Sequence, residues 1–287
     1  MSKRVGFVGL GNIGRPMALR IVGAGFETRV YDVDPGAVRV LVEAGAKSAA
    51  SPAELAAGCS VIGLCVRDDA DVRAVLHGES GVLSAIAPGC VIAIHSTILP
   101  STVEELGRAA AERGVGLLDA PMTGGAAGAQ AGTLTFMVGG AEPDLERCRG
   151  LFSACASRIV HTGPLGTGAA TKLCNNLMTY LGFLSAFEAT LLASRAGLSL
   201  SAFEEVTRAN GNLTDQMRAF LALHKIPANQ QASEAFQAQL RSFTTLAEKD
   251  LAATLAFARE NGVALPGAGL CQQLMARVYG LEDSARR

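Results

Sequence analysis

Short apolar runs recur through roughly the first 160 residues of this 287-residue chain, and helix-forming segments separate them. Such runs predict buried strands, and strands that alternate with helices predict a parallel sheet with right-handed crossovers. The expected strands are Val5–Val8, Thr28–Tyr31, Val61–Val66, Val91–His95, Gly116–Asp119, Leu134–Val138 and a last one near Arg158–Val160. The pattern therefore predicts an N-terminal α/β domain with a doubly wound parallel sheet.

Local signals mark the ends of several helices. The first helix is expected to run to about Ala24, with Pro16 in its first turn and Gly25 as its C-terminal stop. The segments 51–54 (Ser-Pro-Ala-Glu) and 101–104 (Ser-Thr-Val-Glu) both have the form of a capping box, in which the serine caps a helix.

The pattern changes near Pro164, after which the strand signal vanishes. We therefore expect an α/β domain over residues 1–164 and an all-α domain over residues 165–287, built on a long interdomain helix within residues 163–197. Apolar residues lie almost all round that helix, namely Leu173, Leu177, Leu181, Leu184, Leu191 and Leu192. This predicts a helix that is buried on most faces, against the sheet domain and a second subunit, so a homodimer or homotetramer is expected.

Composition excludes several classes of function. A net charge of -1 gives no reason to expect nucleic acid or a membrane as partner, and no apolar run is expected to reach membrane-spanning length without polar breaks. The seven cysteines are odd in number and form no C-x-x-C pair, and the four histidines show no ligand spacing, so we expect reduced thiols and no metal site. The reduced thiols predict a cytoplasmic protein, and the first strand is expected to begin almost at once, which leaves no room for a targeting peptide.

The first expected strand ends in a glycine-rich turn that opens a helix. A G-x-G-x-x-G pattern in that position is the fingerprint of a dinucleotide-binding Rossmann domain. Gly9 permits the tight turn, Gly11 lets the backbone approach a pyrophosphate, and Gly14 lets the helix pack closely on the strand. The helix N-terminus then offers free N–H groups to the phosphates. The turn residues expected at the cofactor are Gly9, Gly11, Asn12, Ile13 and Gly14.

An acidic residue, Asp32, ends the second expected strand. At this position a carboxylate hydrogen-bonds the ribose hydroxyls and repels a 2′-phosphate. Arg29 precedes Asp32 and no basic residue follows until Arg39, so NAD is expected in preference to NADP. The alternative is that Asp32 is a solvated turn residue in the segment 32–35 (Asp-Val-Asp-Pro).

Residues 119–134 are rich in glycine and alanine and follow a strand directly. Such a segment is typical of a loop that a ligand approaches closely, at the edge of the sheet where ligands collect. Its N–H groups and the Thr123 hydroxyl are suited to a substrate carboxylate. The alternative is a flexible turn of small residues.

Four stretches carry a resemblance when they are taken together. They are the opening GFVGLGNIGRPMA, the loop DAPMTGGAAGAQAGTL, the pattern GxxGxGxxxKxxxN from Gly163 to Asn176, and FTTLAEKDL at residues 243–251. From about residue 4 to 280 the chain resembles the β-hydroxyacid dehydrogenase family, which includes 3-hydroxyisobutyrate dehydrogenase, tartronate semialdehyde reductase and, more distantly, 6-phosphogluconate dehydrogenase. The resemblance implies that Lys172 is catalytic and that Asn176 helps to hold the substrate. The other residues it implies are Thr123, Gly124 and Gly125 at the substrate, and Val66, Thr97 and Lys249 at the cofactor near its nicotinamide end.

Three departures leave the particular substrate open. Thr123 stands where the family usually has serine, and His95 stands where aspartate is common. Residues 224–242 are polar and glutamine-rich where the family is shorter and more apolar. As an isolated histidine at a strand end, His95 is expected to be structural.

The expected chemistry needs a base for the substrate hydroxyl. No histidine has a supported position, so Lys172 is the candidate, and Asn176 lies four residues on, on the same helix face. Burial in the interdomain cleft, the helix N-terminus and Lys249 are each expected to lower the pKa of Lys172 toward working pH. The alternatives are that Lys172 is a solvated side chain and that Lys249 is one charge on a solvated face.

The predicted function is hydride transfer between NAD(H) and a small β-hydroxy acid such as 3-hydroxyisobutyrate, glycerate or tartronate semialdehyde. One alternative is an imine reductase, a class that shares this fold but usually replaces the lysine. Another is a non-catalytic dinucleotide-binding protein.

Overall fold

The computed structural model describes residues 4–281, and internal contacts divide the chain into two compact units with a boundary between Lys172 and Leu173. From the loss of the strand signal, the sequence predicts a domain boundary at residue 164. The observed division instead falls inside the long helix, a few residues after it begins.

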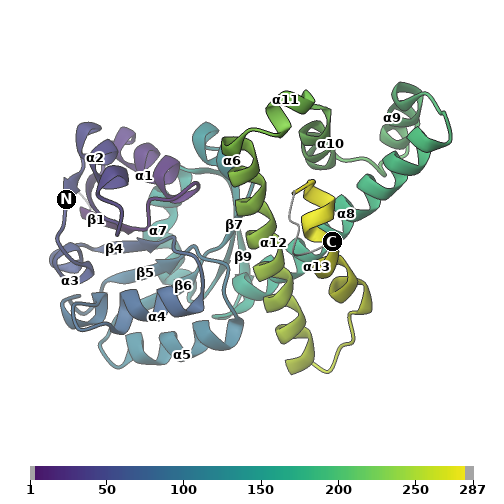
Figure 1. Cartoon of the computed structure of the whole chain (residues 1–287). Coiled ribbons are helices and arrows are strands. Elements are labelled where there is room, and N and C mark those ends of the chain that lie inside the picture. The colour runs from purple at the N-terminus through teal and green to yellow at the C-terminus, as the bar shows by residue number, and fades with distance from the viewer. Residues whose placement is uncertain (1–3, 282–287) are drawn as a thin grey trace. The chain divides into compact units, whose positions relative to one another are not determined.

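The described part of the first unit contains a nine-stranded sheet (Figure 1). Its strands are β1 (Arg4–Val8), β2 (Glu27–Tyr31), β3 (Lys47–Ser48), β4 (Val61–Leu64), β5 (Val91–Ile94), β6 (Gly116–Asp119), β7 (Met122–Thr123), β8 (Leu134–Gly139) and β9 (Ala156–Gly163). Their order is β3-β2-β1-β4-β5-β6-β8-β7, and β9 pairs with β8. All pairs from β3 to β6 are parallel, which confirms the predicted doubly wound sheet.

The sheet departs from the prediction at β8, which runs antiparallel to β6 and β7. The segment before β8 was expected to be a loop but contains β7 and the short helix α6 (Gly125–Ala131). This helix has 7 residues and rises only about 10 Å. Because β8 spans about 20 Å, α6 cannot carry the chain back for a parallel crossover. The strands β3 and β7, which the sequence pattern missed, have two residues each.

Helices cover both faces of this sheet. They are α1 (Gly14–Gly23), α2 (Pro35–Glu43), α3 (Pro52–Ala56), α4 (Asp69–His77), α5 (Pro100–Ala111), α7 (Glu142–Ser153) and the 3₁₀ turn η1 (Val82–Ser84), besides α6. Ser51 caps α3 as predicted, because its Oγ accepts the Glu54 N–H at 3.1 Å. The cap predicted at Ser101 is wrong: α5 begins at Pro100, whose fixed φ suits the first helical position, with Leu99 as N-cap.

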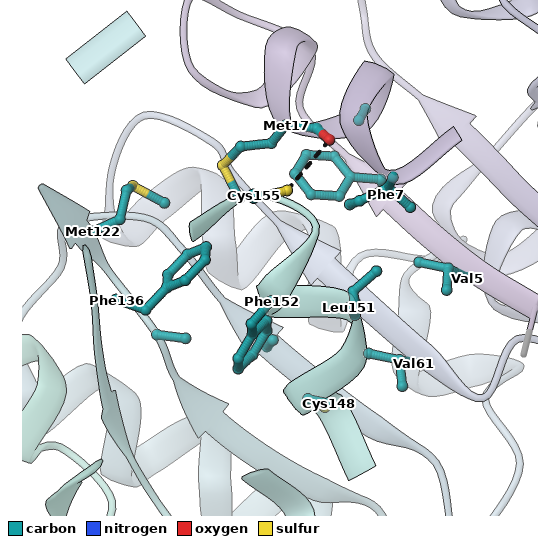
Figure 2. Close-up of a cluster of buried hydrophobic side chains, with 14 of the residues drawn as sticks. Val5, Phe7, Met17, Val61, Met122, Phe136, Cys148, Leu151, Phe152 and Cys155 are labelled. Carbon is teal, nitrogen blue, oxygen red and sulfur yellow. Dashed lines mark hydrogen bonds between the residues drawn. The ribbon is translucent and has the colours of Figure 1, made fainter. Parts of the chain in front are cut away.

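Two apolar clusters fill the space between the sheet and its helices. The cluster under α1, α2, α6 and α7 includes Phe7 of β1, Phe136 of β8 and Phe152 of α7. Figure 2 shows the rings of Phe136 and Phe152 together in this cluster, with centroids 5.0 Å apart. The other cluster packs α3, α4 and α5 against the opposite face of the strands, through residues such as Ile62 and Ile92. Burial on both faces explains why the strands are continuous apolar runs.

The second unit is helical throughout its described residues. It contains most of α8 (Thr167–Arg195), then α9 (Leu200–Ala209), α10 (Asp215–Ala222), the 3₁₀ turn η2 (Leu223–Lys225), α11 (Ala228–Gln231), α12 (Glu234–Glu260) and α13 (Pro266–Tyr279). Its core joins α8, α10, α12 and α13, and Phe183 stacks on Phe220 with ring centroids 4.5 Å apart. This confirms that an all-helical part follows the sheet.

Helix α8 exposes part of its apolar surface within the single chain. Met178 is 76% exposed and Leu192 is 71% exposed, so the predicted burial of these side chains depends on a second subunit. Among the described helices, α8 alone is long and apolar enough to cross a membrane by length and composition, although polar residues such as Asn175, Asn176 and Glu188 interrupt it. A core helix of a soluble protein meets the same criterion, so this is weak support for a membrane span.

Candidate active site

Most of the predicted cofactor residues follow one row of the sheet. The register pairs Val8 with Tyr31 and Leu64, then Leu64 with Ile94, and Ile94 with Asp119. The residues directly after this row are Gly9, Asp32, Cys65, His95 and Ala120. The carboxyl ends of the parallel strands thus bring together the segments that sequence reasoning had selected one at a time.

The turn between β1 and α1 is built on close backbone contacts. Gly9 has φ +92°, and a Cβ there would lie 2.2 Å from the Cys65 carbonyl oxygen. A Cβ on Gly14 would lie 2.0 Å from the Gly9 carbonyl oxygen. A Cβ on Gly11 would meet no atom within 4 Å, and Gly11 is exposed. Two glycines therefore close the turn, and the third leaves its outer surface open, which fits a bound pyrophosphate.

Asp32 is held against this turn. Its Oδ2 accepts the Leu10 N–H at 2.5 Å, and its Oδ1 accepts the Asp34 N–H at 2.8 Å. Asp34 in turn caps α2 by accepting the Gly36 N–H at 2.8 Å. Asp32 therefore does more than end a turn, because its carboxylate is fixed beside the glycine-rich segment.

The loops after β4 and β5 are tied to each other. The Val66 N–H donates to Ser96 Oγ at 2.9 Å. Further along, Asp69 Oδ1 accepts the Leu99 N–H at 3.0 Å and the Thr102 hydroxyl at 2.6 Å. Val66 and Thr97, the residues expected near the nicotinamide, thus lie on two loops joined at adjacent strand ends.

His95 belongs to the core of the first unit. It is 3% exposed, its Nδ1–H donates to the Ala120 carbonyl at 2.9 Å, and its ring lies among Phe7, Phe136 and Phe152. Burial lowers the pKa of His95 to about 4, despite the backbone hydrogen bond that opposes this. The neutral, enclosed ring confirms the structural role expected for it.

The predicted substrate segment leads from β7 into α6. Thr123 is half-buried and pairs with Thr135 of β8. Gly124 and Gly125 are exposed and have φ of +122° and +63°, in the region that favours glycine. The glycines thus turn the chain sharply next to the Thr123 side chain.

The start of α8 rests on Asp119, a residue that sequence reasoning did not select. Asp119 is 1% exposed at the end of β6, and it accepts the Gly166 N–H at Oδ1 (2.9 Å) and the Ala169 N–H at Oδ2 (2.7 Å). A Cβ on Gly168 would lie 2.5 Å from the Met137 carbonyl oxygen, so the first turn packs directly on strand backbone. Desolvation raises the pKa of Asp119, against the hydrogen bonds that lower it. Lys172 lies five residues after the first residue of this anchored helix.

Asn176, one turn after Lys172, is held by a second buried carboxylate. The Asn176 Nδ2 donates to Asp250 Oδ2 at 2.8 Å, and the Tyr180 hydroxyl donates to the same oxygen at 3.1 Å. Lys249 Nζ forms an ion pair with Asp250 Oδ1 at 2.9 Å. Asp250 lies in the stretch 243–251 that carries the resemblance, but sequence reasoning treated it only as a neighbour of Lys249.

Among the described residues, no group of three or more His, Cys, Asp or Glu side chains is placed to hold a metal ion. A glycine turn that fits a pyrophosphate, a fixed carboxylate at the next strand end and a lysine on an anchored helix define a dinucleotide-dependent oxidoreductase as the class of protein.

Comparison with known proteins gives the family. Residues 4–163 match the NAD-binding domain of 6-phosphogluconate dehydrogenase, and residues 166–285 match the NAD-binding domain of NADP-dependent 3-hydroxyisobutyrate dehydrogenase. The chain belongs to the β-hydroxyacid dehydrogenase family. It is therefore an NAD(P)-dependent dehydrogenase that acts on the CH–OH group of small 3-hydroxy acids. This family membership favours a β-hydroxyacid dehydrogenase over the two alternatives, an imine reductase and a non-catalytic dinucleotide-binding protein.

Two relatives and one solved structure illustrate the family. The chain is 37% identical over 242 residues to the NAD-dependent L-serine dehydrogenase of Pseudomonas aeruginosa, covering 83% of this chain and 81% of that protein. It is 32% identical to the 3-hydroxyisobutyrate dehydrogenase of the same organism, covering 95% and 91%. The structure of Mycobacterium tuberculosis 3-hydroxyisobutyrate dehydrogenase with L-serine matches with a TM-score of 0.83 at 30% identity, covering 98% and 94%.

Proposed function

We propose that the chain transfers a hydride between NAD(H) and a small 3-hydroxy acid, with Lys172 as general acid and base. The observation that carries this proposal is the shared face of α8 on which Lys172 and Asn176 lie one turn apart. Asp119 supports it, because this carboxylate fixes the turn that precedes Lys172.

The protein residues supply proton transfer and positioning. In the oxidative direction the Lys172 amine takes the hydroxyl proton, and in the reductive direction its ammonium returns a proton to the forming alkoxide. A bound nicotinamide supplies the hydride acceptor or donor. Proton transfer of this kind contributes about 10²–10⁴-fold to the rate. Asn176 holds the substrate without adding a charge.

The segment Thr123–Gly125 is proposed to bind the substrate carboxylate. Support comes from the exposure of Gly124 and Gly125, from their positive φ, and from the Thr123 hydroxyl directly before them in the chain. A 3-hydroxy acid then fits better than a neutral alcohol. We propose L-serine and 3-hydroxyisobutyrate as the first candidates, with glycerate and tartronate semialdehyde next; the names of the relatives support the first two.

For the cofactor we propose NAD in preference to NADP. The glycine turn, Gly9 to Gly14 with Asn12 and Ile13, is proposed to hold the pyrophosphate, and Asp32 to hold the ribose hydroxyls. The fixed Asp32 carboxylate supports this preference, since it would repel a 2′-phosphate. Val66, Thr97 and Lys249 are proposed to border the nicotinamide end. The ratio of kcat/KM for NAD to that for NADP tests the preference, and a ratio near one or below contradicts it.

The exposed apolar residues of α8 support a homodimer or homotetramer. Met178 and Leu192 are large and mostly exposed, and the following helix α9 has no buried residue. Covering such surface with a second copy stabilises both chains through the hydrophobic effect. A cytoplasmic location remains a prediction, made from the cysteine pattern of the sequence; Cys59, Cys90, Cys148, Cys155 and Cys271 are buried.

Substrate profiling tests the proposed function. NAD-linked turnover would be followed at the nicotinamide absorbance with 3-hydroxyisobutyrate, L-serine, glycerate, 3-hydroxypropionate and 4-hydroxybutyrate, and in reverse with tartronate semialdehyde. The methyl ester of 3-hydroxyisobutyrate is the matched neutral substrate. We expect turnover of at least one 3-hydroxy acid and a much lower kcat/KM for the ester. Equal values for acid and ester would contradict carboxylate recognition, and no turnover by an enzyme that binds NADH would contradict the substrate class.

A further inference from the structure

Asp250 is a charged residue with almost no access to water. It lies on α12 and is 2% exposed, in the core of the second unit that α8 and α12 share. Burying a carboxylate is unfavourable unless hydrogen bonds or a counter-charge compensate for the lost hydration. The hydrogen-bond and ion-pair partners of Asp250 therefore indicate the role of its charge.

The two oxygens of Asp250 have different partners. Oδ2 accepts one hydrogen bond from Asn176 Nδ2 at 2.8 Å and another from the Tyr180 hydroxyl at 3.1 Å. Oδ1 lies 2.9 Å from Lys249 Nζ as an ion pair, although among the described residues it accepts no well-aligned hydrogen bond. Oδ2 is thus hydrogen-bonded to two side chains of α8, and Oδ1 is paired with the neighbouring lysine on α12.

The carboxylate determines which way the Asn176 amide faces. An ionised carboxylate accepts hydrogen bonds and cannot donate them, so the amide must turn its NH₂ group toward Asp250. Its carbonyl oxygen Oδ1 then faces away from Asp250. The only donor recorded for that oxygen among the described residues is Asn175 Nδ2 at 3.5 Å, a long contact that leaves the acceptor largely available.

Tyr180 is the second donor to Asp250 Oδ2. Burial, followed by the charge of Asp250, raises the pKa of Tyr180 well above its usual value, so the phenol keeps its proton and donates it to the carboxylate. Asn176 is itself only 5% exposed, which leaves its side chain little freedom to choose another rotamer. Asn176 and Tyr180 thus each donate one hydrogen bond to the same oxygen of Asp250.

We propose that Asp250 is a positioning residue that locks the Asn176 amide so that it offers the active site a hydrogen-bond acceptor and not a donor. This rests on the proposed function, in which Asn176 holds the substrate. The consequence is chemical: the Asn176 Oδ1 receives a proton-bearing group of the substrate, and this oxygen does not stabilise a developing alkoxide, which needs donors. Stabilising the alkoxide is then left to Lys172.

Variants of Asp250 and Asn176 separate positioning from simple support of the fold. In Asp250→Asn the new side chain has nearly the same shape but can donate as well as accept, so the Asn176 amide is free to turn over. We expect kcat at saturating cofactor to fall about 10- to 100-fold, the order expected when a hydrogen bond to a charge is lost. Tyr180→Phe is the matched control, since it removes the other hydrogen bond to the same oxygen and should leave kcat within about 2-fold.

A double-mutant cycle gives the decisive comparison. If Asp250 acts through Asn176, Asp250→Asn should lower kcat little further once Asn176→Ala is present, and the double variant should match Asn176→Ala alone. Losses that multiply would overturn the proposal, and so would an equal loss in Tyr180→Phe. Turnover that survives Lys172→Ala would instead contradict the proposed function and not the role of Asp250.

A spectroscopic measurement decides the matter even without turnover. The side-chain NH₂ signals of Asn176, assigned by their loss in Asn176→Ala, should show slow hydrogen exchange in the wild-type protein. In Asp250→Asn that protection should fall at least about 10-fold, because a neutral amide holds the NH₂ group less strongly. Unchanged signals in Asp250→Asn would overturn the proposal.

Discussion

The Asp119 carboxylate at the end of β6 accepts the backbone N–H of Ala169, fifty residues later in the chain, at 2.7 Å. Its other oxygen accepts the N–H of Gly166 at 2.9 Å, just before the first residue of α8. A strand end thus caps the helix that carries Lys172, and satisfies two N–H groups that a helix start leaves without a partner.

Removal of this cap should destabilise the protein. Asp119→Ala leaves two buried N–H groups without an acceptor, which should lower the free energy of unfolding by about 2–4 kcal/mol. Urea unfolding measures this. Asp215→Ala is the control, because Asp215 also lies at a helix start but its side chain is 90% exposed. Equal stability of the two variants would show that Asp119 does not anchor α8.

Alanine substitutions at Gly14 and Gly11 should affect different properties, the first stability and the second cofactor binding. Gly14→Ala places a Cβ against the Gly9 carbonyl and should lower the free energy of unfolding by about 2 kcal/mol or more. Gly11→Ala meets nothing within 4 Å, so stability should hold while the Kd for NADH rises about 10-fold or more. Calorimetry and fluorescence titration measure the two quantities, with the exposed Gly23→Ala as control. Unchanged NADH affinity in Gly11→Ala would contradict the pyrophosphate site.

The features predicted correctly from the sequence are local ones. The glycine turn, the strand that ends at Asp32 and the Ser51 cap each depend on residues within a few positions of one another, where propensity and hydrogen-bonding capacity decide the outcome. The parallel pairing of β1, β2, β4, β5 and β6 follows from the helices between these strands, since a crossover needs their length.

The features that were missed depend on residues distant in sequence. Asp119 meets Ala169 fifty residues later, and Asn176 meets Asp250 seventy-four residues later. The hydrophobic periodicity of the sequence does not predict such pairs, because each pair depends on how a helix packs on another element. The exposure of Leu192 in the single chain agrees with the predicted second subunit, but apolar composition does not say which side chains that subunit would cover.

Acid should weaken the fold through His95. Burial lowers its pKa from 6.5 to about 4, so below pH 6.5 the unfolded chain binds a proton that the folded chain excludes. The stabilising contribution is complete above the unfolded pKa and is lost as the pH falls toward 4. Between about pH 7.5 and about pH 5 this amounts to about 2 kcal/mol. In urea unfolding, His95→Gln should lack this part of the pH dependence, whereas the exposed His77→Gln should keep it. Identical pH slopes for wild type and His95→Gln would contradict this account.

A charge on the exposed face of α8 should dissociate the proposed oligomer. Leu192→Arg places a guanidinium on a residue that is 71% exposed in the single chain, so it should fold normally but resist burial in an interface. Light scattering during size exclusion should show a multiple of the chain mass for wild type and a smaller mass for the variant. Val33→Arg, at a residue 88% exposed in the first unit, should leave the mass unchanged. A wild-type protein that is already monomeric would refute the oligomer.

The most direct test of the central claim is the turnover of Lys172→Ala on the best 3-hydroxy acid. We expect kcat to fall about 10²–10⁴-fold while NADH binds with nearly unchanged Kd, because the lysine moves a proton and does not hold the dinucleotide. Cys174→Ala, at an exposed position two residues further along α8, should keep wild-type turnover. If Lys172→Ala retains turnover within about 10-fold of wild type, Lys172 is not the general acid and base.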